Sequence, residues 1–477
     1  MLRFEEYRRH DAIGLAGLVA GGETTAAELL ETAIARAEAV DPVINALSQR
    51  HHDLARTAIR AGLPRGPFRG VPFLLKDVSV QLAGTETSNC SSLFAGSVAD
   101  ADSTLVARYK AAGLVIFGKT NTPEMGLAAS TETALHGTTR NPWNLERSAG
   151  GSSGGAAAAV AAGIVPAAQG SDGGGSIRIP ASCCGLFGLK PTRARTPLGP
   201  LVGESWGSMG VVHVLTRSVR DSAALLDASH GPAPGDPYAA PAVTRPYSQE
   251  VGVDPGRLRV ALQLRPLSGS PVDAECIAAA RGAADLLVSM GHVVEEAGLP
   301  GPYEPLATAA WALVATGVTG ALNRRAAALG RPLREDDVEP VTWRAVRHAS
   351  TLTALDHAEA LLAIHQHGRR MAAFHERHDI VLSPTLGQVP VPLGPQRMSN
   401  PDLDAYTAAL LRFTPFCNVF NMSGEPSMSV PLHWSADGLP VGVMFSAAFG
   451  REDLLLRLAG RLEEARPWFD RLPDLHA

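Results

Sequence analysis

Residues 150–192 read GGSSGGAAAAVAAGIVPAAQGSDGGGSIRIPASCCGLFGLKPT, and the two serines in the glycine-rich parts, Ser152 and Ser176, stand 24 positions apart. Glycine adopts backbone conformations that other residues avoid, so a run of glycines allows a tight turn. In such a turn, successive backbone N–H groups converge on one point and stabilise an oxyanion. The sequence therefore predicts an oxyanion hole formed by Gly173, Gly174, Gly175 and Ser176.

The same stretch also matches the GxSxG pattern of a nucleophile elbow, at Gly150-x-Ser152-x-Gly154 and again one residue later. That elbow requires a strand directly before its serine. The preceding residues, NPWNLERSAG, are polar and irregular, and none of the 15 histidines stands in a convincing motif. A Ser-His-Asp triad is therefore the weaker interpretation.

A further pattern, GLVIFGKT at 113–120, fits the GxxxxGK(S/T) loop that cradles nucleotide phosphates. In that loop the variable residues follow a strand, but here the apolar residues 114–117 resemble the strand itself. Pro123 also disrupts the start of the expected helix. We therefore interpret this segment as a strand and expect no cofactor. Metal-type CxxC spacing is absent as well, so we expect no metal.

Lysine is scarce in the chain. Lysine and arginine together number 42, of which only Lys76, Lys110, Lys119 and Lys190 are lysine. A drift from lysine to arginine should spare sites where arginine cannot serve, because a guanidinium group keeps its proton in a protein and an ammonium group can lose it. Each remaining lysine is therefore a candidate for a functional role.

Upstream of the glycine-rich stretch, residues 70–77 read GVPFLLKD. Together with GGSSGG and GGSIR, whose serines have the same 24-residue spacing, this segment resembles the amidase signature family. The resemblance continues through GKTNTPEMG (118–126), LTRSVRDSAALLD (215–227) and NMSGEPSMSVP (421–431) and covers most of the chain. Gly173 is a departure, since many relatives have threonine, isoleucine or another side chain there. Its missing side chain removes no N–H donor but could loosen the turn.

The resemblance implies an amidohydrolase that cleaves a carbon–nitrogen bond through a serine acyl-enzyme. It assigns the nucleophile to Ser176 and the base to neutral Lys76, acting through Ser152, whose hydroxyl both donates and accepts. It also implies a cis peptide bond before Ser152. To act at neutral pH, a lysine must lose roughly 3 units from an ordinary pKa of about 10.4. Burial has this effect, and the apolar residues 71–75 directly before Lys76 predict such burial.

Other polar residues of the motif have structural interpretations. We expect Ser153 and Ser171 to support the loop through hydrogen bonds. Asp172 and Arg178 flank Ser176 and are expected to form an ion pair that fixes the turn, rather than to take part in catalysis.

The remaining lysines and the two adjacent cysteines also have structural interpretations. Lys119 and Lys190 are expected to bind neighbouring loops, and Lys110 is expected on the surface. Cys183 and Cys184 are expected to pack in the core.

Composition and charge exclude several classes of partner. The net charge is -5, the isoelectric point is near 6.3 and no Lys/Arg run is present. The sequence therefore has no cluster of positive charge that would attract nucleic acid or an anionic membrane. The apolar run 154–168 is shorter than the roughly 20 residues of a membrane span. Five cysteines favour a reducing cytoplasm over a disulfide framework. We expect a cytoplasmic protein that binds a small-molecule amide substrate, and we leave a homodimer open.

Strand-like and helix-like segments alternate along the chain. Apolar runs at 71–75, 114–117, 164–168, 259–262 and 380–382 alternate with helical patterns at 102–112, 274–290 and 355–376. This alternation predicts an α/β fold with a large mixed, mostly parallel sheet flanked by helices. We expect a single amidase domain over 1–477. Its signature core would span about 60–230, and its second half, about 256–477, would contribute to the substrate pocket.

The second half guides the prediction of the substrate. GRPLREDDVE (330–339) and FGREDLLLRLAGRLE (449–463) are similar to segments of 6-aminohexanoate cyclic-dimer hydrolases. We expect a small non-peptide amide, with 6-aminohexanoate oligomers, aryl amides and carbamates as candidates, since one oxyanion hole serves each such carbonyl. The alternatives are a glutaminase-type subunit of a tRNA-dependent amidotransferase and an inactive binding relative. Candidate pocket residues, with core packing as the alternative, are Trp311, Val314, Phe413 and Phe416.

Overall fold

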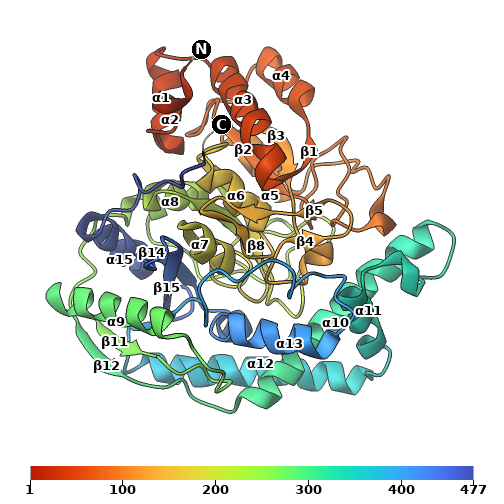
Figure 1. Cartoon of the computed structure of the whole chain (residues 1–477), viewed down its shortest axis with the longest axis vertical. Coiled ribbons are helices and arrows are strands. Elements are labelled where there is room, and N and C mark those ends of the chain that lie inside the picture. Colours follow the sequence, from red (N-terminus) through yellow and green to blue (C-terminus); the bar gives the residue numbers. More distant parts are fainter. Residues whose placement is uncertain (1, 476–477) are drawn as a thin grey trace.

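The computed structural model describes residues 2–475, and these residues form one eleven-stranded sheet with helices around it (Figure 1). In spatial order the strands are β1 (Leu47–Arg50), β3 (Val115–Thr120), β2 (Pro72–Lys76), β8 (Ala167–Asp172), β10 (Val211–Thr216), β9 (Phe187–Lys190), β14 (Ser427–Trp434), β15 (Pro440–Ala447), β13 (Ile380–Pro384), β11 (Arg259–Leu262) and β12 (Val293–Glu296). Two small hairpins lie apart from it: β4 (Glu132–Thr133) with β5 (Gly137–Thr138), and β6 (Arg140–Asn141) with β7 (Asn144–Ser148).

The sheet is mixed, as predicted, but it is not mostly parallel. Parallel pairs occur toward its two ends, where β2 pairs with β3 and β8, and β11 pairs with β12 and β13. The central run from β8 through β10, β9, β14 and β15 to β13 is antiparallel throughout, as is the pair of β1 and β3. The alternation of strands and helices predicts parallel crossovers, whereas the β14–β15 hairpin and the insertion of β10 between β8 and β9 produce antiparallel pairs.

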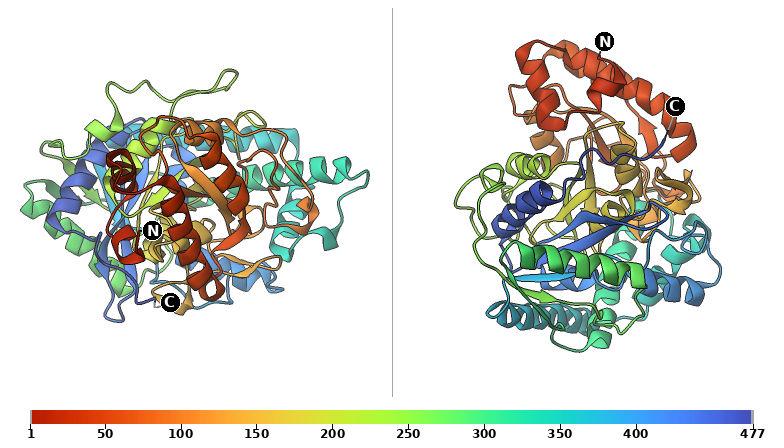
Figure 2. Two further views of the ribbon diagram at one scale, coloured as in Figure 1. Left: turned by 90° about the horizontal axis from the view of Figure 1, so that it is seen from above. Right: turned by 60° about the vertical axis from the view of Figure 1, so that its left-hand side comes forward.

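The helices cover the faces and ends of the sheet. They are α1 (Phe4–Tyr7), α2 (Ala12–Gly21), α3 (Ala26–Ile44), α4 (His52–Ala61), α5 (Thr104–Ala111), α6 (Gly154–Ala161), α7 (Arg178–Cys184), α8 (Val219–Ser229), α9 (Ala274–Ser289), α10 (Tyr303–Ala328), α11 (Pro340–Ala349), α12 (Ala354–His375), α13 (Leu403–Phe413), α14 (Asn418–Ser423) and α15 (Glu452–Ala465). Helices α1–α4 lie at one end of the molecule and α10–α13 at the other (Figure 1). Both chain ends lie beside α1–α4 (Figures 1 and 2).

Several local predictions are confirmed. Thr25 and Glu28 form the capping box at the start of α3. The predicted strands at 71–75, 259–262 and 380–382 become β2, β11 and β13. Gly118 and Lys119 lie inside β3, so the phosphate-loop pattern is part of a strand.

Helix α10 is long and apolar enough to cross a membrane by length and composition, which the sequence prediction did not note. In the fold it packs against α11 and α12. In its most apolar stretch 39% of the residues are buried in the fold.

The start of the Ala/Gly-rich run of the sequence forms helix α6. All eight of its residues are buried, and it packs against β2, β8, β10 and α7. Because alanine and glycine side chains are short, the helix can approach the sheet closely. Ser152 and Ser153 directly precede α6, and Ser176 lies two residues before the start of α7, so the packing of α6 against α7 brings the two serine-bearing turns together.

Candidate active site

The proposed catalytic residues come from the ends of neighbouring strands and helices. Lys76 is the last residue of β2, and β2 runs parallel to β8, which ends at Asp172. Parallel strands direct their carboxyl ends to the same edge of a sheet, so Lys76 and the turn after β8 lie at one edge. Ser176 lies in that turn, and Ser152 lies in the turn before α6. The site thus forms where two strands end and two helices begin.

Lys76 contacts Ser152 directly. Its Nζ donates to Oγ of Ser152 at 2.7 Å and to Oγ of Ser171 at 3.0 Å. The side chain is completely buried, and burial lowers the pKa of Lys76 to about 7, although the charge of Asp172 opposes this shift. A buried lysine with this pKa is substantially neutral at physiological pH and can accept a proton.

The turn that carries Ser152 is connected to the turn that carries Ser176. The Gly151–Ser152 peptide bond is cis, as the family resemblance implied. Oγ1 of Thr122 donates to the carbonyl oxygen of Ser152 at 2.8 Å. The backbone N–H of Ser153 donates to the carbonyl oxygen of Ser176 at 3.2 Å, and Oγ of Ser153 donates to the carbonyl oxygen of Ser171 at 3.2 Å. Ser153 therefore has the supporting geometry that the sequence predicted.

The glycine turn has free N–H groups, but not at every predicted position. The N–H of Gly175 donates to Oδ1 of Asp172 at 2.7 Å, so it is already engaged. The N–H groups of Gly173, Gly174 and Ser176 donate to no other residue within 2–475. A Cβ atom on Gly174 would meet open space. Three of the four predicted oxyanion donors therefore remain as candidates, the N–H groups of Gly173, Gly174 and Ser176.

Asp172 and Arg178 form a buried ion pair that holds the turn. Nη2 of Arg178 lies 2.9 Å from Oδ1 of Asp172, and both side chains are fully buried. Burial raises the pKa of Asp172, but the charge and hydrogen bonds of Arg178, together with the Lys190 charge and the Asn421 hydrogen bond, outweigh burial and hold this pKa well below its usual range. Asn421, from α14, donates to Oδ1 of Asp172 at 2.8 Å and accepts from Arg178 at 2.6 Å. The arrangement fits the predicted structural pair, since neither charge reaches solvent.

Sequence reasoning did not single out two residues that shape this site. Oε1 of Gln169 accepts the backbone N–H of Lys76 at 2.8 Å, which fixes the end of β2 against β8. Asn421 completes the Asp172 network from a position 249 residues away. Its only signal was its place at the start of the family-like segment 421–431.

The other lysines bind neighbouring chain segments as expected. Lys119 donates to the carbonyl oxygen of Glu86 and to Oγ1 of Thr87, and burial lowers its pKa to about 8. Lys190 donates to the carbonyl oxygen of Pro191 at 2.9 Å, and burial lowers its pKa to about 7. Lys110 is exposed over 42% of its side chain and pairs with Asp102. The described part of the chain thus shows these three lysines without a serine hydroxyl partner.

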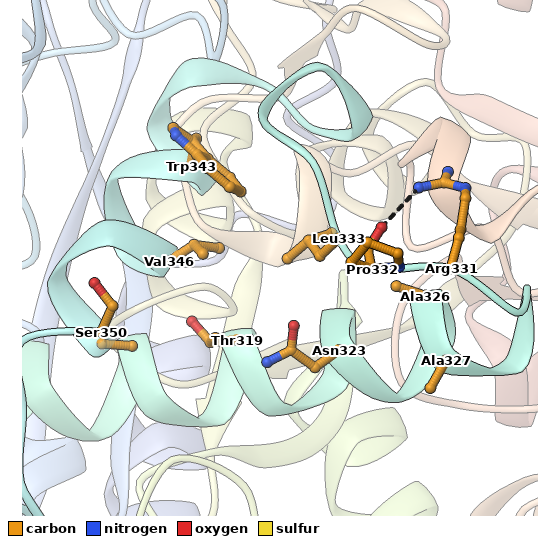
Figure 3. A pocket seen from close by; sticks show the side chains of 11 residues that line it. Thr319, Asn323, Ala326, Ala327, Arg331, Pro332, Leu333, Trp343, Val346 and Ser350 are labelled. Carbon is orange, nitrogen blue, oxygen red and sulfur yellow. Dashed lines mark hydrogen bonds between the residues drawn. The ribbon is translucent and has the colours of Figure 1, made fainter.

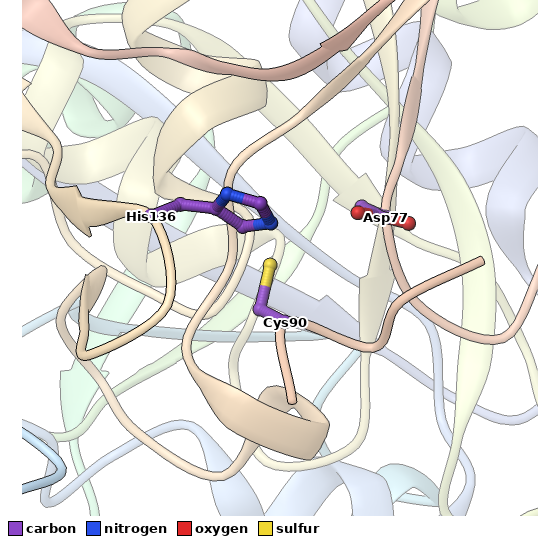
Figure 4. Close-up of side chains that lie close together, drawn as sticks. All are labelled: Asp77, Cys90 and His136. Carbon is purple, nitrogen blue, oxygen red and sulfur yellow. The ribbon is translucent and has the colours of Figure 1, made fainter. Parts of the chain in front are cut away.

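Asp77, which follows Lys76 in the sequence, lies close to Cys90 and His136 (Figure 4). Their potential ligand atoms all lie within 4.8 Å of one another. The carboxylate of Asp77, however, already accepts hydrogen bonds from Ser88 and from two side chains of β1, and Nζ of Lys119 lies 3.9 Å from it. A metal ion would meet an occupied carboxylate and a nearby ammonium group, so the donor set fits a hydrogen-bond network better than a metal centre.

A groove lies between α10 and α11, and Lys76, Ser152 and Ser176 are not among the residues that line it (Figure 3). Its volume is about 610 Å³ and it is lined by residues such as Thr319, Arg331, Leu333 and Val346. Leu333 and Val346 pack in the same apolar cluster as Met125, which precedes Gly126 beside Ser152. The GRPLREDDVE segment therefore lies between this groove and the active-site region.

The four candidate pocket residues differ in position. Phe413 and Phe416 are fully buried in the main core, so the packing alternative holds for both. Trp311 is partly exposed and stacks on His348 of α11. Val314 is partly exposed and packs in the apolar clusters that contain Trp206. Of the four, Val314 remains the best candidate for a pocket residue.

The sequence model of the family described as Amidase matches residues 28–456. The chain belongs to the amidase family. It is thus a hydrolase of amide carbon–nitrogen bonds, and its fold class is that of the amidase signature enzymes.

Among amidases, several relatives match nearly the whole chain. A 6-aminohexanoate-cyclic-dimer hydrolase of Pseudomonas sp. (strain NK87) is 43% identical over 98% of this chain and 96% of its own length. The solved structure of a 6-aminohexanoate cyclic dimer hydrolase superposes with a TM-score of 0.93 at 41% identity, covering 98% of this chain and 99% of that chain. A bacterial aryl acylamidase gives a TM-score of 0.86 at 27% identity, with 96% of each chain covered.

Proposed function

We propose that Ser176 is the nucleophile of this amidase and that Lys76 and Ser152 form its proton relay. The observation that carries the proposal is the 2.7 Å contact between Nζ of a fully buried Lys76 and Oγ of Ser152. A buried, largely neutral lysine next to a hydroxyl is the pairing that a Ser-Ser-Lys mechanism requires. The proposed oxyanion donors are the N–H groups of Gly173, Gly174 and Ser176.

In the proposed reaction, Oγ of Ser176 attacks the substrate carbonyl carbon. Its proton passes to Oγ of Ser152, and the proton of Ser152 passes to Nζ of Lys76. The three backbone N–H groups stabilise the oxyanion of the tetrahedral intermediate. When the C–N bond breaks, Ser152 protonates the leaving amine and recovers a proton from Lys76. Water then releases the acyl group by the reverse transfer.

We further propose that the substrate is a small non-peptide amide with an aliphatic acyl chain. The identity to 6-aminohexanoate-cyclic-dimer hydrolases over nearly the full chain supports 6-aminohexanoate oligomers as the first substrates to test. The similarity to an aryl acylamidase supports aryl amides as a second group. The five described cysteines are all unpaired and buried, which supports a cytoplasmic location.

A substrate panel tests the proposal. Wild type and Ser176→Ala are incubated with cyclic and linear 6-aminohexanoate oligomers, an aryl amide, an aryl carbamate and glutamine, and released amine is measured. We expect turnover of the oligomers or the aryl amide by wild type alone. Activity on glutamine with none on the other substrates would instead support the glutaminase subunit, which should also co-purify with partner chains.

A further inference from the structure

The indole ring of Trp206 lies against the glycine turn of the active site. Trp206 belongs to the loop 203–210 that precedes β10. A Cβ atom built on Gly173 would lie only 2.5 Å from Cζ3 and 2.6 Å from Cε3 of Trp206. The ring therefore occupies the space that a side chain at position 173 would need.

The opposite edge of the same ring lies against helix α10. A Cβ atom built on Gly317 would lie 2.7 Å from Cδ1 of Trp206. The indole is thus wedged between two glycines, one in the turn next to Ser176 and one in the second half of the chain. The Gly173 departure from many relatives is explained by this packing, and the turn is filled rather than loosened.

The backbone around Trp206 adopts a conformation that a bulky residue rarely takes. Trp206, Gly207 and Ser208 have φ values of 54°, 61° and 63°, all in the left-handed region. Such a residue persists only where its surroundings hold it, and these sites often serve to position a group. Hydrogen bonds from Met209 N to Trp206 O at 3.2 Å and from Gly210 N to Ser205 O at 3.1 Å close the loop.

Trp206 is held on one side and open on the other. Its ring packs in the apolar clusters that include Leu313, Val314 and Met125. Trp206 itself remains partly exposed, as do Gly173 and Ser176. Open space faces Gly174, so a substrate that reaches the oxyanion donors passes beside the indole.

The geometry indicates which part of the substrate lies against the ring. The leaving amine must reach Ser152, which supplies its proton, and Gly126 marks that side because a Cβ there would lie 3.3 Å from Oγ of Ser152. Trp206 instead packs on Gly173, at the start of the oxyanion turn. Met125, next to Gly126, shares an apolar cluster with Trp206, but the ring itself lies directly against Gly173, and this direct contact is the basis for assigning the indole to the acyl group.

We propose that Trp206 is a specificity-determining residue whose indole, wedged between Gly173 and Gly317, forms the wall of the acyl pocket and selects unbranched apolar acyl chains. The proposal rests on the proposed function of the Ser176 site. A flat ring offers van der Waals contact to an extended methylene chain, whereas a branch next to the carbonyl meets the ring face. The ring also excludes water from the acyl side of the oxyanion turn.

The test compares acyl chains at a constant leaving group. For wild type, Trp206→Ala and Trp206→Phe, kcat/KM is measured on acetyl, hexanoyl and cyclohexanecarbonyl 4-nitroanilides. We expect Trp206→Ala to lower the hexanoyl-to-acetyl ratio roughly tenfold or more, as is typical for hydrophobic pocket contacts, and to raise the relative rate on the cyclohexanecarbonyl substrate. Trp206→Phe, which keeps a smaller ring, should give intermediate ratios.

A double-mutant cycle distinguishes the proposed role of Trp206 in the acyl pocket from a general structural role. Gly317→Ala places a methyl group against the indole, so it should change the acyl ratios in the wild-type background and have no effect in Trp206→Ala. Thermal unfolding of each variant checks that it is folded. Equal loss of kcat/KM on all three acyl groups, additive effects of the two substitutions, or a change that follows the amine in a matched anilide series would overturn the proposal.

A second probe keeps this inference distinct from the proposed function. Short-chain and long-chain alkyl fluorophosphonates react with an activated serine without amide turnover. If wild type cleaves no anilide but both probes label Ser176, aryl anilides are not substrates, and the Trp206 inference is decided by the chain-length ratio of the labelling rates. A ratio unchanged by Trp206→Ala would refute it. If neither probe labels Ser176, the proposed nucleophile fails.

Discussion

The pH dependence of acylation tests the proposed role of Lys76 most directly. The perturbation is pH itself, applied to a lysine that is fully buried and whose pKa burial lowers from 10.5 to about 7. Only the neutral amine can accept the proton that Ser152 passes on. Because the shift is downward, the neutral form is scarce below pH 7 and dominant above it.

The size of the effect follows from the shift. A fall of this size corresponds to about 5 kcal/mol in favour of the neutral form, at about 1.4 kcal/mol per pKa unit. An unshifted lysine would have less than about one molecule in a thousand neutral at pH 7, whereas Lys76 would be about half neutral. Below pH 7 the acylation rate should therefore fall about tenfold per pH unit, and above pH 7 it should reach a plateau.

The assay is the rate of fluorophosphonate labelling at Ser176, measured between pH 5 and 10 as a single turnover. Lys76→Ala should abolish the labelling. Lys190→Met is the matched control, because burial also lowers the pKa of Lys190 to about 7 but its Nζ contacts only a backbone carbonyl. This variant should keep the rise near pH 7. Lys119→Ala, if it folds, should keep a measurable fraction of the activity.

Three results would refute this reasoning. A rise centred near pH 10 would mean that Lys76 is not desolvated in the working enzyme. If the pH profile of labelling shifts in Lys190→Met, the group that titrates is Lys190 and not Lys76. Equal loss of labelling in folded Lys76→Ala and Lys119→Ala would remove the special role of Lys76.

The remaining predictions concern the nucleophile and the turn that holds it. Ser152→Ala should slow labelling by orders of magnitude, since removing one member of a catalytic unit costs most of its effect, while the adduct stays on Ser176; peptide mapping that finds it on Ser152 contradicts this. Asp172→Ala leaves Arg178 buried without its partner and should lower the free energy of unfolding by about 3–5 kcal/mol. Urea denaturation measures this loss, and a loss below about 1 kcal/mol would mean that the pair does not hold the turn.

The local features of this site were accessible from the sequence because they depend on short segments. The GVPFLLKD segment predicted a buried strand that ends in Lys76, and β2 is that strand. The spacing of Ser152 and Ser176 reflects two turns on either side of α6 and β8. These relations are set by consecutive residues, and strand and helix signals report such residues well.

Features that depend on distant segments were missed or only partly predicted. The sheet was expected to be mostly parallel, because nothing local in β9 or β10 reveals that each pairs antiparallel with its neighbours. The engagement of the Gly175 N–H by Asp172 depends on the folded shape of the turn. Trp206 stood in a polar loop without a motif, and only its contacts with Gly173 and Gly317 make it a candidate.

The scarcity of lysine shows how far a compositional argument reaches. Three of the four lysines, Lys76, Lys119 and Lys190, are fully buried in the described chain, so scarcity identifies desolvated amines rather than catalysis. The hydrogen-bond acceptors of the three amines distinguish Lys76 from the other two buried lysines. Lys190 donates to a backbone carbonyl oxygen, which has no proton to pass on. Lys119 donates to a backbone carbonyl oxygen and to the hydroxyl of Thr87, which itself donates to the carbonyl oxygen of Val80. Lys76 contacts two serine hydroxyls, and a hydroxyl both donates and accepts. A relay needs that double capacity, and among the three buried lysines of residues 2–475 only Lys76 contacts a hydroxyl of the serine-bearing turns, that of Ser152.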